Sequence, residues 1–186
     1  MLLLVGLGNP TPNSNNNRHN VGFKIVDAIN QKFGLSKQKP KFKGLLTTGT
    51  IGDKKIYAIK PLTFMNNSGI CIRELLEYFK MDAEDVIVFH DDLDVEFGKI
   101  KAKFGGSNAG HNGIASIDKF IGKDYSRVRI GIGKPENKTS VSDYVLNDFS
   151  DDEQEHLEKI TSNIIDSLSI LIDKKLDLFS STVNNN

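Results

Sequence analysis

The chain has 186 residues, of which 38% are hydrophobic and 26% charged, a balance typical of a folded globular protein. Its 24 basic and 24 acidic side chains give a net charge of zero. This excludes a protein that coats nucleic acid through bulk positive charge, although a local basic patch is still allowed. The single cysteine, Cys71, excludes an internal disulfide and a thiolate cluster for zinc.

The first residues and the lack of a long apolar run predict where the protein is located, and the lack of a linker predicts its domain organisation. The first residues contain no basic region and no small-residue cleavage site, and no apolar run approaches the roughly 20 residues of a membrane span. We therefore expect a cytoplasmic protein with no membrane partner, and a lone cysteine suits a reducing compartment. Without a linker or internal repeat, residues 1–183 are predicted to form one domain, followed by a frayed tail at 184–186.

The first half of the chain alternates predicted strands and helices. Residues 2–5 form a short apolar run that stops at glycine, as in a strand buried on both faces. After a polar loop, apolar residues at helical spacing predict a helix that ends near residue 33, with Asn20 as its candidate cap. Strands are predicted over 45–51 and 56–59, and a second helix over 68–79.

The second half continues the alternation. An apolar strand over 86–89 is predicted, and residues 100–104 alternate with period two, so one face of that strand should be wet and basic. A helix near 112–121 and a strand over 128–132 follow. Residues 134–146 are a candidate lid. From residue 151, apolar residues keep helical spacing over more than twenty positions, which predicts one long amphipathic helix.

This pattern predicts an α/β fold. We expect a single domain with a mixed, mostly parallel twisted sheet, helices on both faces and a long C-terminal amphipathic helix. We expect a monomer, because the long helix can pack on its own sheet. Ligands of such sheets bind at the carboxyl ends of the strands, so the polar residues found there are the candidate site.

Two local motifs suggest rival functions. Gly6-x-Gly8 follows a strand in the manner of a dinucleotide-binding turn, but Thr11 stands where the third glycine would fall, so nucleotide binding is disfavoured. A possible metal cluster is formed by His90, Asp91, Asp92 and Asp94. Neighbouring residues of a strand point to opposite faces, so this cluster is not expected to share one ion. We therefore expect neither a metal nor an organic cofactor.

His19 is the candidate general base. It lies at a loop-to-helix junction, and Asp91 lies at a predicted strand end that should be nearby. A neutral imidazole whose other nitrogen donates to a carboxylate is a good base near neutral pH. No serine lies in a Gly-x-Ser-x-Gly context, so water is the expected nucleophile.

Three asparagines lie at predicted strand or loop ends: Asn9, Asn66 and Asn112. An amide side chain can donate to a substrate carbonyl and accept from a substrate N–H, which suits peptide recognition and oxyanion stabilisation. For any one of them taken alone, a role in a turn or a helix cap is the better interpretation.

Six short motifs follow one another along the chain: Gly6-Leu7-Gly8-Asn9-Pro10, Arg18-His19-Asn20-x-Gly22, Phe64-Met65-Asn66-x-Ser68-Gly69, His90-Asp91-Asp92-Leu93-Asp94, Gly110-His111-Asn112-Gly113 and Arg129-Ile130-Gly131-Ile132-Gly133. In this order they closely resemble the bacterial-type peptidyl-tRNA hydrolase family. The resemblance implies an esterase that cuts the bond between a peptide and the terminal ribose of tRNA. Its partner would be the acceptor end and nascent peptide of peptidyl-tRNAs released by the ribosome.

The resemblance also implies roles for individual residues. His19 matches the general base and Asp91 the carboxylate that stabilises it. Asn9 matches the position that separates blocked from free aminoacyl-tRNA. Further substrate contacts are implied for Phe64, Asn66 and Asn112. Family members usually carry tyrosine where this chain has Ser14, so we expect the aromatic contact at the edge of the site to be lost and Ser14 to offer a polar contact to the substrate.

The charge distribution suits a tRNA substrate. Residues 95–135 contain eight Lys and Arg against three acids, whereas residues 151–186 contain three against eight. The family match implies phosphate binding by Lys103 and Arg129, which would position tRNA without reading its sequence. The alternative for Lys101 and Lys103 is simple solubility of an exposed strand face. A non-catalytic RNA-binding relative on the same scaffold is a further alternative.

Overall fold

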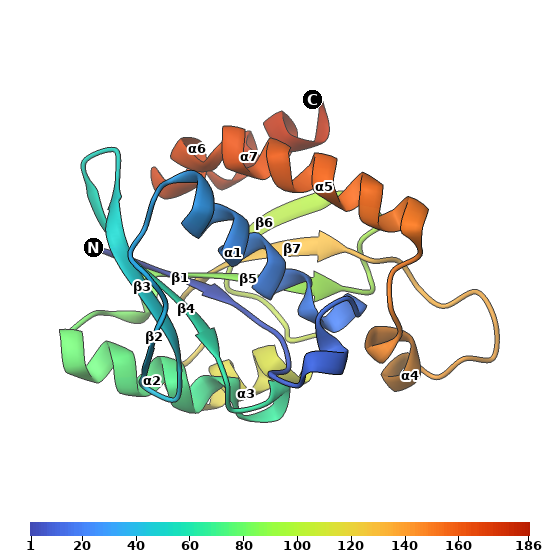
Figure 1. Ribbon diagram of the computed structural model, residues 1–186, viewed down its shortest axis with the longest axis horizontal. Helices are drawn as coiled ribbons and strands as arrows, with labels where there is room; N and C mark the ends of the chain where they lie inside the picture. Colours follow the sequence, from blue (N-terminus) through green and yellow to red (C-terminus); the bar gives the residue numbers. More distant parts are fainter.

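Strand β1 (Leu2–Gly6) lies at the centre of the sheet, since its side chains are buried on both faces. The computed structural model describes residues 1–186 and has one sheet of seven strands in the order β2-β3-β4-β1-β5-β7-β6 (Figure 1). β1 is parallel to β4 (Lys54–Pro61) and to β5 (Val86–Asp92), and β5 is parallel to β7 (Ser126–Gly131). The four central strands are therefore all parallel.

The outer strands run antiparallel to their neighbours. β3 (Gly44–Ile51) pairs with β4, and β6 (Ile100–Phe104) pairs with β7. At the far edge lies β2 (Lys39–Lys41), which the sequence did not predict. Its three residues are all exposed, so no apolar pattern marks them, and its lysines and Pro40 discourage further strands from pairing at this edge.

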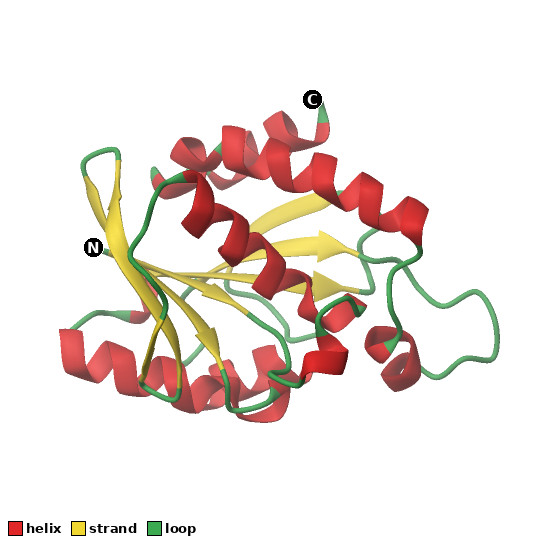
Figure 2. Cartoon of the chain, in the orientation of Figure 1, coloured by secondary structure: helices red, strands yellow, loops and turns green.

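Alternate residues of β1 belong to two hydrophobic cores, one on each face of the sheet. Leu2 and Leu4 face α1 (Val21–Lys32) and the C-terminal helices, while Leu3 and Val5 face α2 (Ser68–Phe79) and α3 (Asn112–Ile121). Figure 2 shows the sheet between these two helical layers. The predicted α/β class, with a mixed sheet and helices on both faces, is confirmed.

The prediction of one long C-terminal helix is corrected. The helical region begins at Asp151 as expected but consists of α5 (Asp151–Asp166), α6 (Leu168–Ile172) and α7 (Leu176–Asn184). At the buried Ser167 the backbone N–H is shared between the carbonyls of Asn163 and Ile164, and the helical ladder is interrupted. The apolar spacing continues across this bend, so the pattern contains no sign of it.

The expectation of a frayed tail is wrong for Asn184. This residue ends α7, and its side chain accepts a hydrogen bond from the Ile100 N–H and donates one to the Ile100 carbonyl, both at 2.9 Å. Ser180 likewise accepts from the N–H of Ala102. Helix α7 thereby occupies backbone groups along the open edge of β6, which otherwise invite pairing with another strand.

The remaining helices are short. They are η1 (Pro12–Ser14), η2 (Arg18–Asn20), η3 (Met65–Asn67), η4 (Ala83–Asp85) and α4 (Val141–Leu146). No helix has both the length and the apolar character required to cross a bilayer. In Figure 1, α4 and the loop that precedes it project from the body of the molecule on the side of the carboxyl ends of β1 and β5.

Candidate active site

The chain order places a crevice at the carboxyl ends of β1 and β5. After β1 the chain passes to the β2–β4 side of the sheet, and after β5 it passes to the β6–β7 side. Ligands of open α/β sheets bind where the strand order reverses in this way. η2 follows β1 and carries His19, while β5 ends with Asp91 and Asp92.

Glycines allow α1 to pack closely against β1 and β5, which places η2 at this crevice. A Cβ on Gly22, in the first turn of α1, would lie 2.3 Å from the carbonyl oxygen of Phe89 in β5. A Cβ on Gly6 would lie 2.3 Å from the carbonyl oxygen of Gly22. Gly6 therefore serves helix–strand contact. This packing accounts for the glycine that suggested a nucleotide-binding turn.

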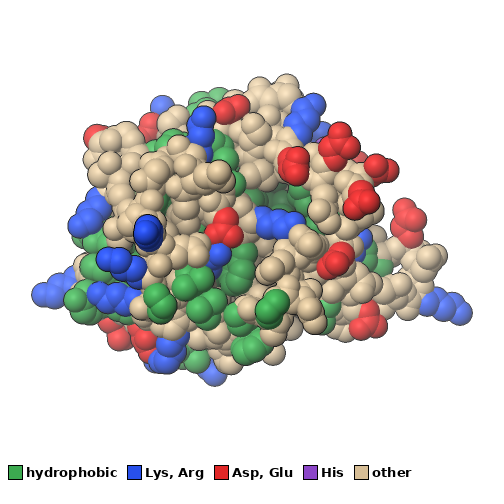
Figure 3. Space-filling view, viewed as in Figure 1, with side chains coloured by type: hydrophobic (Ala, Val, Ile, Leu, Met, Phe, Trp, Pro, Cys, Tyr) green, Lys and Arg blue, Asp and Glu red, His purple; other side chains and the backbone are tan.

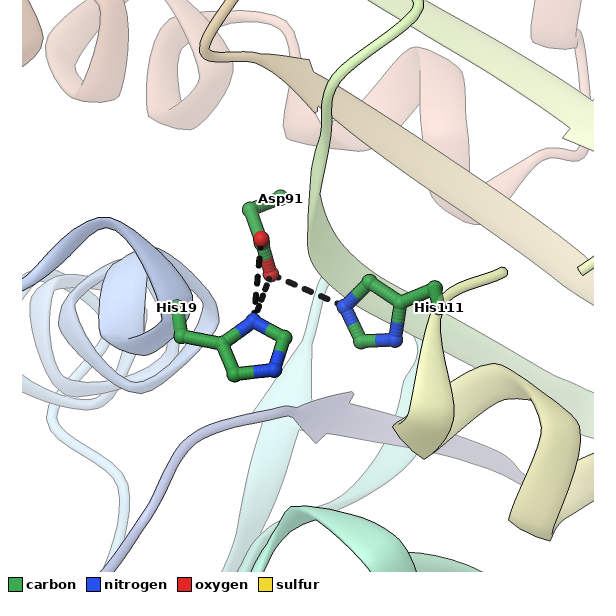
Figure 4. A group of neighbouring side chains, drawn as sticks. All are labelled: His19, Asp91 and His111. Atoms are coloured by element: carbon green, nitrogen blue, oxygen red, sulfur yellow. Dashed lines mark hydrogen bonds and ion pairs between the residues drawn. The ribbon is translucent and has the colours of Figure 1, made fainter. Parts of the chain in front are cut away.

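Asp91 lies between two imidazole rings (Figure 4). The Nδ1 atom of His19 is 2.9 Å from each carboxylate oxygen of Asp91, and the Nε2 atom of His111 is 2.9 Å from its Oδ1. His19 and Asp91 are both buried, with 8% and 1% of their surfaces exposed. His19 and Asp91 are therefore neighbours, as the sequence predicts.

His111 was not singled out by the sequence analysis. Its Nδ1 accepts hydrogen bonds from the N–H groups of Gly113 and Ile114, so its ring caps the N-terminus of α3. The proton of the neutral ring must then be on Nε2, which donates it to Asp91. A histidine directly before a helix start, within Gly-His-Asn-Gly, was the available signal.

The electrostatics keep Asp91 charged. Burial by itself raises the pKa of Asp91, but His111 and His19, through charge and hydrogen bonds, bring it well below its usual range. His90 lies under the site, with its ring edge-on to His111 at 5.0 Å and its Nδ1 donating to the Asp91 carbonyl. Burial, reinforced by His111, lowers the pKa of His90 to about 3, so this ring is neutral.

The predicted substrate residues surround one cavity of about 420 Å³. Its wall includes His19 together with Asn9, Ser14, Phe64, Asn66 and Asn112. A second cavity of about 460 Å³ adjoins it, shares His19 and Asn112, and reaches Asp91 and His111. The Nε2 atom of His19 makes no hydrogen bond within the protein, so its lone pair is available at this junction.

Asn9 is held in one orientation. The backbone N–H of Asn9 donates to the side chain of Asn20, and the backbone carbonyl of Asn9 accepts from it. The Asn20 side chain is therefore engaged with Asn9 and does not cap α1, contrary to the expectation. The Oδ1 atom of Asn9 accepts from the N–H of Met65 at 2.9 Å. Because this bond fixes the amide, the Nδ2 group of Asn9 remains a hydrogen-bond donor on the cavity wall.

Phe64 stores backbone strain at the mouth of the cavity. Its φ of 62° and ψ of 158° lie in a region that L residues rarely occupy, at a cost of roughly 1–3 kcal/mol. The N–H of the next residue, Met65, donates to Asn9, and Phe64 is 53% exposed. Across the cavity wall, the hydroxyls of Thr11 and Ser14 lie 2.6 Å apart and give that edge its polar character.

Lys103 and Arg129 lie on adjacent strands outside these cavities, where β6 pairs with β7. Lys103 is exposed and makes no ion pair. Arg129 instead donates from Nε to Asp92 Oδ2 at 2.7 Å, a pairing that the sequence did not predict. Asp92 also accepts from the N–H of Asp94.

The surface charge is uneven, and its acidic part lies where the sequence predicts it. Figure 3 shows acidic side chains gathered over the start of α5, where Asp151, Asp152 and Glu153 occupy the first turn. Lys and Arg side chains are more frequent on the opposite side of the same view, around the β2–β4 hairpins. Acidic side chains at a helix N-terminus complement the helix dipole, so the acidic end of α5 has a structural explanation of its own.

Comparison with known proteins identifies the family. A sequence profile described as Peptidyl-tRNA hydrolase matches residues 3–186. A peptidyl-tRNA hydrolase of Pelagibacter ubique (strain HTCC1062) is 82% identical over 185 residues and 100% of both chains. Another, of Wolbachia sp. subsp. Drosophila simulans (strain wRi), is 49% identical and covers 88% of this chain and 91% of its own.

A solved structure agrees. The crystal structure of peptidyl-tRNA hydrolase from Acinetobacter baumannii superimposes with a TM-score of 0.92 at 33% identity and covers 99% of this chain and 94% of its own. The match includes the sheet, both helical layers and the C-terminal helices. The chain belongs to the peptidyl-tRNA hydrolase family.

Proposed function

We propose that this protein hydrolyses the ester bond between a peptide, or an N-blocked aminoacyl group, and the terminal ribose of tRNA. Family membership supports the reaction, which recycles tRNA from peptidyl-tRNAs released by the ribosome. The observation that carries the mechanism is the 2.9 Å contact of His19 with a charged, buried Asp91 beside a cavity lined with asparagines.

In the proposed mechanism His19 is the general base. The Asp91 carboxylate holds the ring proton on Nδ1, so the lone pair of Nε2 is free to take a proton from water. The water oxygen attacks the ester carbonyl, and Asp91 stabilises the imidazolium that forms. When the tetrahedral intermediate collapses, the ester C–O bond breaks and Nε2 returns the proton to the leaving ribose oxygen.

The asparagines and Phe64 recognise the substrate. Asn9 presents Nδ2 at a fixed angle, which suits a peptide carbonyl near the scissile bond and thereby separates blocked from free aminoacyl groups. Asn112 lies beside His19 in both cavities and is placed to donate to the developing oxyanion or to orient the water. Asn66, Phe64 and Ser14 complete the wall of the substrate cavity.

Lys103 and Arg129 bind backbone phosphates of the tRNA in this account. Lys103 is exposed without an acid partner, so its charge is available to an anion. Arg129 donates to Asp92 through Nε alone, and its two terminal nitrogens make no hydrogen bond within the protein. Such contacts position many different tRNAs equally, because phosphate carries no sequence information.

The hydrogen bonding also supports a reaction without a metal. Ligand atoms of His19, Asp91 and His111 lie within 4.8 Å of one another, the spacing of a metal site. A metal at His111 would need the lone pair of Nε2, which would move the ring proton to Nδ1, against the N–H groups of Gly113 and Ile114. We therefore propose that a chelator does not affect the activity.

We further propose that the protein acts as a cytoplasmic monomer. The apolar face of α5, including Leu157, Ile160 and Ile164, is buried in the protein's own core, so it needs no second chain. The one cysteine is buried and unpaired, which suits a reducing compartment. Sedimentation at micromolar concentration should give a single species of 20.6 kDa.

One assay tests the proposed activity. Purified protein is mixed with N-acetyl-aminoacyl-tRNA, with the same aminoacyl-tRNA unblocked, and with blocked substrate plus chelator. We expect free tRNA from the blocked substrate with and without chelator, and none above background from the unblocked one. Equal release from both substrates would reject the proposed role of Asn9, and no release from either would reject the proposed function.

A further inference from the structure

Arg18, the residue before His19, takes no part in the proposed reaction but is tied to a distant part of the chain. Its Nη1 donates to the carbonyls of Tyr144 and Asn147, both at 3.3 Å, and its Nη2 donates to Glu153 at 3.2 Å. Its backbone N–H also donates to the Asn147 carbonyl. The Arg18 side chain is only 12% exposed, and its contacts with Tyr144 and Glu153 are partly buried.

The guanidinium also lies on an aromatic ring. Its central carbon is 4.2 Å from the ring centroid of Tyr144, within the range of a cation–π contact. The hydroxyl of Tyr144 donates to the carbonyl of Ile132, just beyond β7, at 2.6 Å. Tyr144 is thus held by Arg18 at its ring and by the end of the sheet at its hydroxyl.

Helix α4 depends on these contacts for its position. It has six residues, and of these only Val145 is buried. The segment before it, 136–140, is entirely exposed. Nevertheless Val145, Leu146 and Ser142 line the cavity beside His19. A short helix with one buried side chain has little hydrophobic burial to fix it, so polar anchors decide where it lies.

We propose that Arg18 is a positioning residue that holds α4 in place as a wall of the substrate cavity. The inference rests on the proposed function, since it concerns binding of the same substrate. His19 itself is anchored separately by Asp91, so the proton transfers do not require Arg18. Loss of Arg18 therefore weakens substrate binding and leaves the rate of the bound complex largely unchanged.

A purely structural role makes a different forecast. Glu153 also accepts from the N–H of Ser150 and completes the capping box of α5, so α5 keeps its cap without Arg18. If Arg18 served only global stability, its loss would reduce the fraction of folded enzyme. That would lower the apparent kcat and leave KM unchanged, because the remaining folded molecules would be normal.

The test compares Arg18→Met, Arg18→Lys and Tyr144→Leu with Arg73→Met as the matched control. Arg73 lies on α2, pairs with Glu77 and covers the ring of Phe120, outside the cavity. KM and kcat are measured on N-acetyl-aminoacyl-tRNA, and amide hydrogen exchange is followed over residues 141–147 and in α5. Exchange reports the position of α4 whether or not the protein hydrolyses this substrate.

For Arg18→Met we expect a rise in KM of about tenfold, the size of losing hydrogen bonds from a charged group, with kcat within about twofold. Exchange should quicken over 141–147 but not in α5. Arg18→Lys should not restore KM, because an ammonium cannot reproduce the planar fork and the stacking. Tyr144→Leu should behave like Arg18→Met, and Arg73→Met like the parent protein.

Two results would overturn the proposal: unchanged exchange over 141–147 in Arg18→Met, or a lower kcat with unchanged KM. If the unmodified protein fails to hydrolyse the substrate, the proposed function fails. In that case quickened exchange over 141–147 in Arg18→Met still supports the positioning role, and unchanged exchange rejects it.

Discussion

The Nε2 atom of His111 lies 2.9 Å from the Oδ1 atom of Asp91. The other nitrogen of His111 is occupied by the N-terminus of α3, whereas the other nitrogen of His19 is free at the cavity. The two rings therefore share one carboxylate but have different functions in the proposed mechanism. His111 helps to hold Asp91, and His19 exchanges protons with the substrate.

This division predicts different effects for two substitutions of His111. His111→Ser keeps an oxygen that can cap α3 but removes the donor to Asp91, so kcat should fall about 10-fold to 100-fold. His111→Ala removes both functions and should cost about 1 kcal/mol more in the free energy of unfolding. Urea titration and single-turnover assays measure the two quantities. Equal stability of the two variants would contradict the capping role.

Asp91→Asn tests whether the negative charge of the carboxylate beside His19 is needed for the reaction. The amide preserves the size of the side chain but cannot stabilise an imidazolium, so we expect kcat to fall by on the order of 10³-fold to 10⁴-fold. The matched control is His156→Gln, on the exposed first half of α5. A fall of less than tenfold in Asp91→Asn would indicate that the carboxylate only orients His19.

The neutral, buried His90 predicts a particular acid sensitivity. Its pKa is lowered to about 3 in the folded protein, whereas in the unfolded chain it is near the ordinary value of roughly 6.5. Its contribution to stability is therefore complete above pH 6.5 and declines as the pH falls toward 3, because only the unfolded chain takes up the proton. The free energy of unfolding should drop by up to about 1.4 kcal/mol per pH unit from this residue.

Urea titrations between pH 7 and pH 4 measure that slope. His90→Gln should flatten it by about one proton. The lowered pKa of Asp91 acts in a different window, because its contribution is complete above about pH 4 and is lost only below it. An identical slope in His90→Gln and the parent protein would show that His90 is not the titrating group.

The proposed phosphate contacts predict a salt dependence of tRNA binding. Lys103→Gln should reduce the slope of log affinity against log salt by about one, and it should weaken binding to all tRNAs alike. Arg129→Gln should have a smaller effect, because Asp92 already offsets part of its charge. Lys39→Gln, on the opposite edge of the sheet, is the control. An unchanged slope in Lys103→Gln would remove that residue from the interface.

Much of the fold followed from local patterns. Continuous apolar runs predicted β1 and β5, because a strand buried on both faces needs apolar side chains at every position. Helical spacing predicted α1, α2 and α3 to within a few residues. The rule that ligand-binding residues meet at carboxyl strand ends then predicted that His19 and Asp91 are neighbours.

The features that the sequence did not predict are not marked by its apolar patterns, and some of them depend on contacts between distant residues. The bend at Ser167 preserves the apolar spacing, so no local pattern reports it. Asn184 resembles a disordered tail until its contact with β6 is known. The capping of α3 by His111 and the pairing of Arg129 with Asp92 depend on side-chain directions that only the folded chain defines.

The most direct test of the account is the single-turnover rate of His19→Ala on N-acetyl-aminoacyl-tRNA, with binding of uncharged tRNA measured on the same preparation. We predict a rate lower by on the order of 10²-fold to 10⁴-fold and tRNA affinity within about twofold, since the imidazole moves protons and does not hold the tRNA. A variant that cleaves the ester at close to the parent rate would contradict the assignment of His19 as the base.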